Sequence, residues 1–323
     1  MFSIFNIKSK SDFKQKTFEV FKHQFENNAV YRSFCDLLNI HVTDVSEISQ
    51  IPFLPIEFFK THKVISSQNS IQEVFTSSGT TKNKTSKHYV TDISVYTKSY
   101  HDGFKKFYGN IEDYVILALL PNYIEQKESS LIYMVDDLMK CTKNSESGFF
   151  LKNHQKLAKK LQLLDKKGQK VLLIGVSFAL LDLIENHQFE LVNTIVMETG
   201  GMKGRRKELI RTELHDLLKK GFGTNQIHSE YGMTELLSQA YSKHDGIFNC
   251  PPWMQVLTRD TEDPLTVLSN QKIGGINIID LANYNSCSFI ATQDLGKVYD
   301  DHSFEILGRF DHSDIRGCNL MIN

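Results

Sequence analysis

The central part of the chain alternates between two kinds of hydrophobic pattern. Short, nearly continuous apolar runs predict strands that are buried on both faces. These runs span residues 114–120, 171–176 and 192–198. Between and after them, apolar residues recur at helical spacing over residues 154–166, 178–186 and 207–220. This alternation of strand and helix is typical of an α/β fold in which parallel strands are covered by helices.

The two ends of the chain follow different patterns. Apolar residues at helical spacing predict an amphipathic helical region over 11–38, and the following elements are a short strand over 73–76 and a helix over 91–108. After Tyr241, turn residues separate short predicted strands at 253–258, 275–280, 288–292, 297–299 and 304–307. We therefore expect an α/β core over residues 1–241 and a small antiparallel β-rich part over residues 242–323 of the same unit.

Composition excludes several classes of protein. The 323-residue chain carries 37 Lys and Arg against 38 Asp and Glu, so no basic excess points to nucleic acid. Its longest apolar runs are too short to cross a bilayer, so no transmembrane segment is expected. The five scattered cysteines lack the paired spacing of a metal finger and favour a reducing, cytoplasmic setting.

The first candidate for chemistry is a hydroxyl-rich loop after the strand predicted over 73–76. The loop consists of Ser77, Ser78, Gly79, Thr80 and Thr81. Its hydroxyl and backbone N–H groups can point at one phosphate group, and Gly79 permits backbone conformations that other residues resist. The segment is not a P-loop, because it lacks that motif's Gly-Lys-Ser/Thr ending. Taken alone, its composition is more typical of a polar surface turn.

The second candidate follows the short strand predicted over 226–230. Tyr231 offers a ring that can stack on a purine, and Gly232 allows a close backbone approach to a ligand. Thr234 can donate to a phosphate oxygen, and the carboxylate of Glu235 is a hard oxygen ligand for Mg²⁺. An ordinary strand-to-helix turn can contain the same residues, so the segment alone leaves both interpretations open.

Two further segments carry polar side chains toward the C-terminus. Asp294 lies within residues 292–296, and an aspartate at a strand end can accept both ribose hydroxyls, although Asp and Gly also favour hairpin turns. Arg309 lies within residues 308–311, and its fork of donors suits ribose or phosphate oxygens. Its alternative interpretation is an ordinary surface arginine.

Together, these four segments resemble the adenylate-forming superfamily, whose order they follow over residues 77–311. That superfamily includes acyl-CoA synthetases, peptide-synthetase adenylation domains and luciferases, which use ATP to convert a carboxylic acid into an acyl-AMP. The resemblance implies the adenylate-forming α/β fold, with parallel sheets covered by helices and a small C-terminal antiparallel β section. It also implies ATP and Mg²⁺ as cofactors and a carboxylic acid as substrate.

The resemblance further implies roles for residues at matching positions. Residues 77–81 would grip the phosphates of ATP. Tyr231 would stack on the adenine, and Thr234 would contact the α-phosphate. Glu235 would bind Mg²⁺, and Asp294 and Arg309 would hold the ribose. Gly200 and Gly201 follow a predicted strand and resemble the family's glycine turn beside the adenine, although a glycine pair is also common in plain loops.

A narrower resemblance is to the LuxE-type acyl-protein synthetases, the fatty-acid-activating subunits of the bacterial bioluminescence reductase. It rests on residues 129–135, 197–204 and 316–318 and covers most of the chain. In that family the acyl group passes from acyl-AMP to a cysteine near the C-terminus and then to a partner protein. Cys318 matches that cysteine. From the residues alone, a thiol beside Arg316 is either a partly ionised nucleophile or a small unreactive side chain.

Two departures from the superfamily pattern bear on mechanism. The phosphate loop reads Lys82-Asn83-Lys84 where the family has Gly-x-Pro-Lys, so the phosphate-binding lysine is not assigned. Full-length members also continue into a mobile C-terminal domain with a catalytic lysine, and only residues 310–323 follow Arg309 here. We expect that this domain is absent, as in the short LuxE-type proteins.

The sequence therefore predicts a ligase that activates a carboxylic acid, with a fatty acid as the expected substrate, and passes it to a cysteine thioester. The implied catalytic residues are Thr234, Glu235 and Cys318. Two alternatives remain open. One is a ligase that transfers the acyl group to coenzyme A or an acyl carrier protein, and the other is a non-catalytic scaffold that binds ATP or an adenylate.

Overall fold

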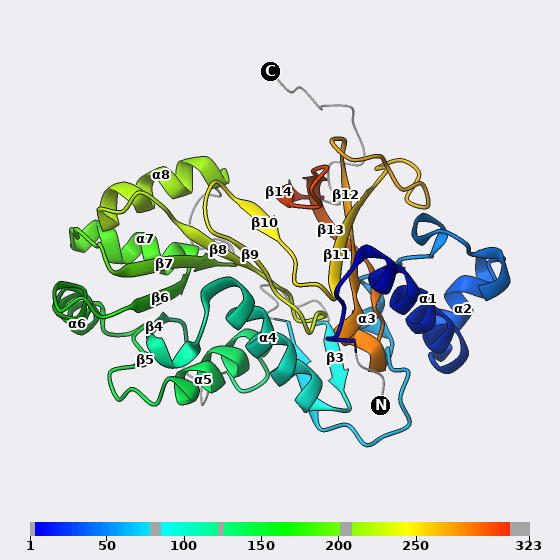
Figure 1. The fold of residues 1–323 in the computed structure, drawn as a ribbon, viewed down its shortest axis with the longest axis horizontal. Helices are drawn as coiled ribbons and strands as arrows, with labels where there is room; N and C mark the ends of the chain where they lie inside the picture. The colour runs from blue at the N-terminus through cyan, green and yellow to red at the C-terminus, as the bar shows by residue number, and fades with distance from the viewer. Residues whose placement is uncertain (1–3, 78–84, 122–125, 201–208, 311–323) are drawn as a thin grey trace.

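The computed structural model of the protein describes residues 4–77, 85–121, 126–200 and 209–310. Within them, a 12-stranded sheet carries helices on its faces and a separate two-stranded hairpin lies beside it (Figure 1). One half of the sheet is parallel and the other half is antiparallel. This arrangement confirms the expected α/β fold with a small antiparallel section toward the C-terminus.

The parallel half is built from buried strands flanked by helices. Its described strands, in sheet order, are β5 (Gly148–Phe149), β4 (Val115–Leu119), β6 (Val171–Val176), β7 (Thr194–Thr199) and β8 (His228–Tyr231). Its helices are α4 (Ile93–Tyr108), α5 (Ser130–Thr142), α6 (His154–Lys166), α7 (Ser177–Asn186) and α8 (Arg211–Phe222). Helices α7 and α8 lie on one face of this half, and α4 and α5 lie on the other (Figure 1). Because both faces are covered, every residue of β4 and β6 is buried, which explains their continuous apolar sequences.

The antiparallel half continues the same sheet. Its described strands, in sheet order, are β9 (Ala240–Ser242), β10 (Ile247–Asn249), β14 (Phe304–Arg309), β13 (Phe289–Val298), β12 (Ile273–Asp280) and β11 (Met254–Arg259). Strand β1 (Leu54–Pro55) pairs in parallel with β13. Strand β9 joins the two halves, since it pairs with β8 on one side and with β10 on the other. The sheet is thus continuous across residue 241, and the expected division of the chain at that position stays a prediction.

The N-terminal helices cover the antiparallel half (Figure 1). The remaining described helices are α1 (Lys10–Asn27), α2 (Ala29–Leu37), α3 (Phe58–Thr61) and the 3-10 turns η1 (Val42–Asp44), η2 (Ile48–Gln50), η3 (Ile111–Asp113) and η4 (Leu281–Asn285). Gln24 of α1 donates from its amide to the backbone oxygen of Tyr284 at 3.1 Å. The ring of Phe21 meets that of Phe289 at 6.0 Å between centroids. None of the helices in the described ranges is long and apolar enough to span a bilayer.

Several predicted elements agree with the structure and others do not. The elements expected at 73–76, 154–166 and 171–176 have those bounds as β2 (Glu73–Thr76), α6 and β6. The helix expected over 11–38 is divided at Asn28, whose side chain accepts from the backbone N–H of Tyr31 and caps the second helix. Helix α5 was not predicted.

The expectation that Asp294 ends a strand was wrong. Residues 288–292 and 297–299 were predicted as two separate strands, but β13 runs without a break through Asp294. A register shift between Leu295 and Gly296 bends the strand there. Such a bulge explains why turn-forming residues occur inside a strand.

Candidate active site

A cavity of about 560 Å³ lies where strands β7 and β8 end, beside the start of helix α5. The predicted site residues that line it are Ser77, Gly200, Gly232 and Thr234. Ligands of open α/β sheets bind beyond the carboxyl ends of the parallel strands. The structure therefore brings Ser77, Gly200 and the segment after β8 to one place at which a substrate is expected.

The hydroxyl loop is held at its base by a β-hairpin. Strand β2 pairs in antiparallel fashion with β3 (Lys87–Val90). Ser77 and Ser86 extend this pairing, because the N–H of Ser77 donates to the oxygen of Ser86 at 3.1 Å and the N–H of Ser86 donates to the Ser77 hydroxyl at 3.0 Å. The two ends of the loop are thereby fixed at the cavity. The other predicted phosphate-binding residues, Ser78, Gly79, Thr80 and Thr81, lie outside the described residues.

The segment after β8 is fitted closely to its neighbours. A Cβ atom at Gly232 would lie 2.6 Å from the Oε1 atom of Glu230, so a larger residue would require that carboxyl group to shift. The backbone oxygen of Thr234 lies 2.9 Å from Nδ1 of the buried His88 in β3. This contact ties the cavity-lining Thr234 to the hairpin that carries the hydroxyl loop.

Glu235, the predicted Mg²⁺ ligand, is buried next to the same hairpin. Burial raises the pKa of its carboxyl group, and a hydrogen bond with Ser86 opposes that effect. Within the described parts of the chain, no lysine or arginine forms an ion pair with it. A buried carboxyl that has no ion-pair partner among the described residues is a fitting donor for a hard divalent cation. Glu235 does not line the cavity itself, and its role as metal ligand stays a prediction.

The predicted adenine and ribose residues form one connected group. The hydroxyl of Tyr231 donates to Oδ2 of Asp294 at 2.7 Å, and Nε of Arg309 donates to Oδ1 at 3.1 Å. Asp294 is buried, whereas the side chain of Arg309 is 70% exposed. Segments that are distant in the sequence thus meet at a single carboxylate, because β13 pairs with β14 and Asp294 lies opposite Arg309.

The ring of Tyr231 has a second set of neighbours. It packs against Phe248 and Phe304, with ring centroids 5.8 and 5.6 Å away. It does not line the cavity, and burial together with the charge of Asp294 raises the pKa of its hydroxyl well above the usual value. In this arrangement the hydroxyl orients Asp294. Stacking of the ring on a purine stays a prediction.

At the end of β7, Gly200 adopts a φ of 67°, a conformation that favours glycine. Its backbone oxygen accepts a hydrogen bond from the hydroxyl of Ser177, at the start of α7, at 3.1 Å. Gly200 is thereby anchored to the start of α7. Gly201, the second glycine of the predicted pair, lies outside the described residues.

Glu230 is a candidate site residue that the sequence analysis missed. It lines the cavity and its carboxyl accepts a hydrogen bond from the hydroxyl of Thr199. Burial raises its pKa to about 7, and the nearby charge of Glu198 adds to the effect. An acidic residue inside a short buried strand is rare without a partner or a role. Its place directly before Tyr231 was the signal that could have identified it.

Four of the five cysteines bear on the predicted nucleophile. Cys318, the predicted nucleophile, lies outside the described residues. Cys35 and Cys287 are fully buried, and burial raises the pKa of Cys35 to about 12 and that of Cys287 further. The pKa of the Cys250 thiol is also raised by burial. Thiols of this kind are poor nucleophiles, because the reactive thiolate is disfavoured.

Known proteins resemble the chain in both sequence and fold. A long-chain-fatty-acid–luciferin-component ligase of Photorhabdus luminescens is 34% identical over 68 residues, which are 21% of this chain and 58% of that protein. ATP-bound MatB from Rhodopseudomonas palustris superposes with a TM-score of 0.56 at 17% identity, over 75% of this chain and 49% of MatB. The chain therefore spans about half the length of MatB.

A second solved structure covers more of the fold. The open conformation of 2-hydroxyisobutyryl-CoA ligase, in complex with 2-HIB-AMP and CoA, superposes with a TM-score of 0.70 at 11% identity, over 94% of this chain and 70% of that one. At such identities the likeness concerns the fold, which is that of adenylate-forming enzymes. The family described as "Acyl-protein synthetase, LuxE" matches residues 5–323. The protein accordingly belongs to the LuxE family of acyl-protein synthetases.

Proposed function

We propose that this protein is an ATP-dependent acyl-protein synthetase, which activates a fatty acid as acyl-AMP and passes the acyl group to a protein cysteine. The observation that supports this most strongly is the family match over residues 5–323. The cavity adds support, since Ser77, Gly200, Gly232 and Thr234, which belong to three predicted ATP-binding segments, line it. A cytoplasmic setting remains an expectation from cysteine usage.

In the first step, a carboxylate oxygen of the acid attacks the α-phosphorus of ATP. The bond between that phosphorus and the oxygen bridging to the β-phosphate breaks, and pyrophosphate leaves with the electron pair. Ser77 and Thr234 donate from the cavity wall to phosphate oxygens, while Asp294 and Arg309 hold the ribose. When bound at Glu235, Mg²⁺ would neutralise charge on the phosphates.

In the second step, the thiolate of Cys318 attacks the carbonyl carbon of the acyl-AMP. A thioester bond forms, the bond to AMP breaks, and AMP leaves as the phosphate anion. The thiol proton passes to solvent. The thioester then delivers the acyl group to an acyl-accepting partner protein.

The test is intact-protein mass spectrometry after incubation with Mg·ATP and carboxylic acids of graded chain length. Wild-type protein is expected to gain one acyl mass that hydroxylamine removes, and the Cys318→Ala variant is expected to release pyrophosphate without that gain. Cys250→Ala is the matched control, because the pKa of its thiol is raised by desolvation and Cys250 should therefore not carry the label. Labelling that survives in Cys318→Ala would refute Cys318 as the acylated residue.

One observation favours a second candidate, a ligase that acylates an external thiol. The solved structure that covers 94% of this chain is a CoA ligase in complex with CoA. This alternative predicts pyrophosphate release and acyl-CoA or acyl-carrier-protein product without any mass gain on the protein. ATP binding without pyrophosphate release would instead indicate a non-catalytic scaffold.

A further inference from the structure

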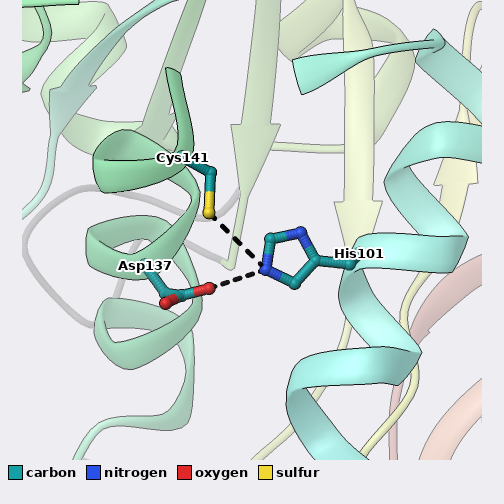
Figure 2. A group of neighbouring side chains, drawn as sticks. All are labelled: His101, Asp137 and Cys141. Carbon is teal, nitrogen blue, oxygen red and sulfur yellow. Dashed lines mark hydrogen bonds and ion pairs between the residues drawn. The ribbon is translucent and has the colours of Figure 1, made fainter. Parts of the chain in front are cut away.

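A group of potential metal ligands joins helices α4 and α5. His101 lies on α4, and Asp137 and Cys141 lie one turn apart on α5 (Figure 2). Nε2 of His101 is 2.8 Å from Oδ2 of Asp137 and 3.8 Å from Sγ of Cys141. One nitrogen, one oxygen and one sulfur ligand atom thus lie within 4.8 Å of one another.

The direction of these contacts separates a metal site from a catalytic triad. In a Cys-His-Asp triad, the carboxylate binds one ring nitrogen of the histidine and the thiol binds the other. Here Asp137 and Cys141 both approach Nε2 of His101, so no proton can be relayed across the ring (Figure 2). Three ligand atoms that lie this close together can share one metal ion.

We propose that His101, Asp137 and Cys141 bind a divalent transition metal ion, with Zn²⁺ as the ion that suits this ligand set best. Zinc accepts imidazole, carboxylate and thiolate ligands in a tetrahedron. Ideal zinc bond lengths place the nitrogen about 3.4 Å from the oxygen and about 3.6 Å from the sulfur. The observed separations of 2.8 and 3.8 Å differ from these values by about 0.6 and 0.2 Å, which rotations of the three side chains can supply.

The surroundings of the group suit this ion. The hydroxyl of Tyr100 donates to Oδ2 of Asp137 at 2.8 Å, which orients the carboxylate as outer-shell partners of metal ligands do. The side chains of His101 and Asp137 are 29% and 34% exposed, so water can reach the fourth position. A Zn²⁺ ion, a thiolate and a carboxylate together carry no net charge.

The site is separate from the proposed catalytic chemistry, although the same helices serve both. Tyr96 of α4 and Ser130 and Met134 of α5 line the cavity, whereas the three ligands follow further along each helix. A bound ion would therefore cross-link the two helices that form one wall of the cavity. Binding to the folded state alone would stabilise the protein by mass action.

The test uses Co²⁺ as the probe, because a tetrahedral cobalt site with a thiolate ligand has characteristic charge-transfer and d–d absorption. The tag-free, reduced wild-type protein is titrated with CoCl₂ and then with ZnCl₂. We expect one equivalent of cobalt, both absorption features, and displacement of the cobalt by zinc. Absence of the charge-transfer feature in wild type would overturn the proposal.

Variants assign the spectrum to these residues. Cys141→Ser should lose the thiolate feature, and His101→Ala should lose tight binding. Tyr100→Phe removes only the outer-shell donor and should weaken cobalt binding roughly tenfold to a hundredfold. A thiolate feature that persists in Cys141→Ser would refute the assignment.

Two matched controls complete the design. Cys318→Ala should keep the full spectrum, which excludes the C-terminal thiol as the ligand. His244→Ala removes the histidine of an exposed His–Asp pair, at 3.0 Å from Asp245, and should also leave the spectrum unchanged. Zinc should raise the melting temperature of wild type and of both controls but not of Cys141→Ser or His101→Ala. A loss of the spectrum in Cys318→Ala would move the site to the C-terminus and contradict the proposal.

Discussion

Two buried glutamates on the adjacent strands β7 and β8 face opposite sides of the sheet. Glu198 lies toward α8, where Nη1 of Arg211 is 2.6 Å away and Nε2 of His215 is 3.6 Å away. Glu230 lies toward the cavity, where its described hydrogen-bond donor is the hydroxyl of Thr199. The two carboxyl groups have the same chemistry and similar burial, but only Glu198 has a cation beside it among the described residues.

Their ionisation differs accordingly. Burial alone would raise the pKa of Glu198, yet the hydrogen bond from His215 and the charge of Arg211 hold it below its usual value. For Glu230, burial raises the pKa to about 7. On the face of the sheet covered by α7 and α8, the carboxylate of Glu198 is thus part of the contacts that stabilise the fold. On the cavity face, no cation of the described residues lies beside Glu230 and its pKa is raised, which is typical of a functional site.

The largest expected effect follows from removal of Arg211, the cation on the face covered by α7 and α8. Arg211→Ala leaves His215 as the remaining described ion-pair partner of the buried Glu198. The free energy of unfolding at pH 7 should therefore fall by about 3–5 kcal/mol. Urea unfolding monitored by circular dichroism measures the change. Part of the loss should be recovered at pH 5, where a Glu198 without its cation is protonated more readily.

A matched control uses the same helix. Lys219→Ala removes a surface pair in which the lysine nitrogen lies 3.9 Å from Asp216, and its effect on stability should be within about 0.5 kcal/mol. Equal losses in Arg211→Ala and Lys219→Ala would contradict the distinction between the two faces.

The second prediction concerns the cavity face and has the opposite sign. Because the pKa of Glu230 rises from 4.5 to about 7 on folding, its protonation stabilises the folded state at low pH. This contribution, about 3 kcal/mol, is present below pH 4.5 and is lost as the pH rises through 7. Glu230→Gln removes the titration, so the variant should become more stable than wild type as the pH rises.

Unfolding in urea at a series of pH values from 4.5 to 8 tests this prediction. Glu213→Gln, at the exposed start of α8, is the control and should follow the wild-type pH profile. Parallel profiles for wild type and Glu230→Gln would show that the charge of Glu230 is compensated in solution.

The sequence predicted the strongly periodic elements of the parallel half correctly. The continuous apolar runs of β4 and β6 and the helical spacing of α6 were predicted correctly, because buried strands and amphipathic helices have strong periodic signals. Segments 77–81 and 231–235 could be recognised because they resemble motifs of the adenylate-forming superfamily, and their ligand-binding roles stay predictions.

What could not be predicted depends on tertiary contacts. The meeting of Tyr231 and Arg309 at Asp294 requires the pairing of β13 with β14, which local sequence does not encode. The contrast between Glu198 and Glu230 depends on which helix covers which face of the sheet. The pattern of residues along one strand does not indicate which helix packs on each face.

The third prediction tests how much the hydrogen bond on the cavity face contributes. Thr199→Val keeps the side-chain shape but removes the hydroxyl that donates to Glu230. Because the acceptor is a buried carboxyl group, the free energy of unfolding at pH 8 should fall by about 2 kcal/mol. The loss should be smaller in the Glu230→Gln background, and a double-mutant cycle measures this coupling. Equal losses in both backgrounds would show that the hydroxyl acts independently of the charge.

The smallest expected effect comes from removal of the equivalent hydroxyl on the face covered by α7 and α8. The hydroxyl of Ser177 lies 3.2 Å from Oε2 of Glu198, and this one donor is shared with the backbone oxygen of Gly200. Ser177→Ala should therefore reduce stability by only about 0.5–1 kcal/mol, since Arg211 continues to neutralise Glu198. Urea unfolding at pH 8, beside Thr199→Val, gives the direct comparison. If Ser177→Ala were the more damaging change, the cation on this face would not compensate the carboxylate, and the two glutamates would have to be regarded as equivalent.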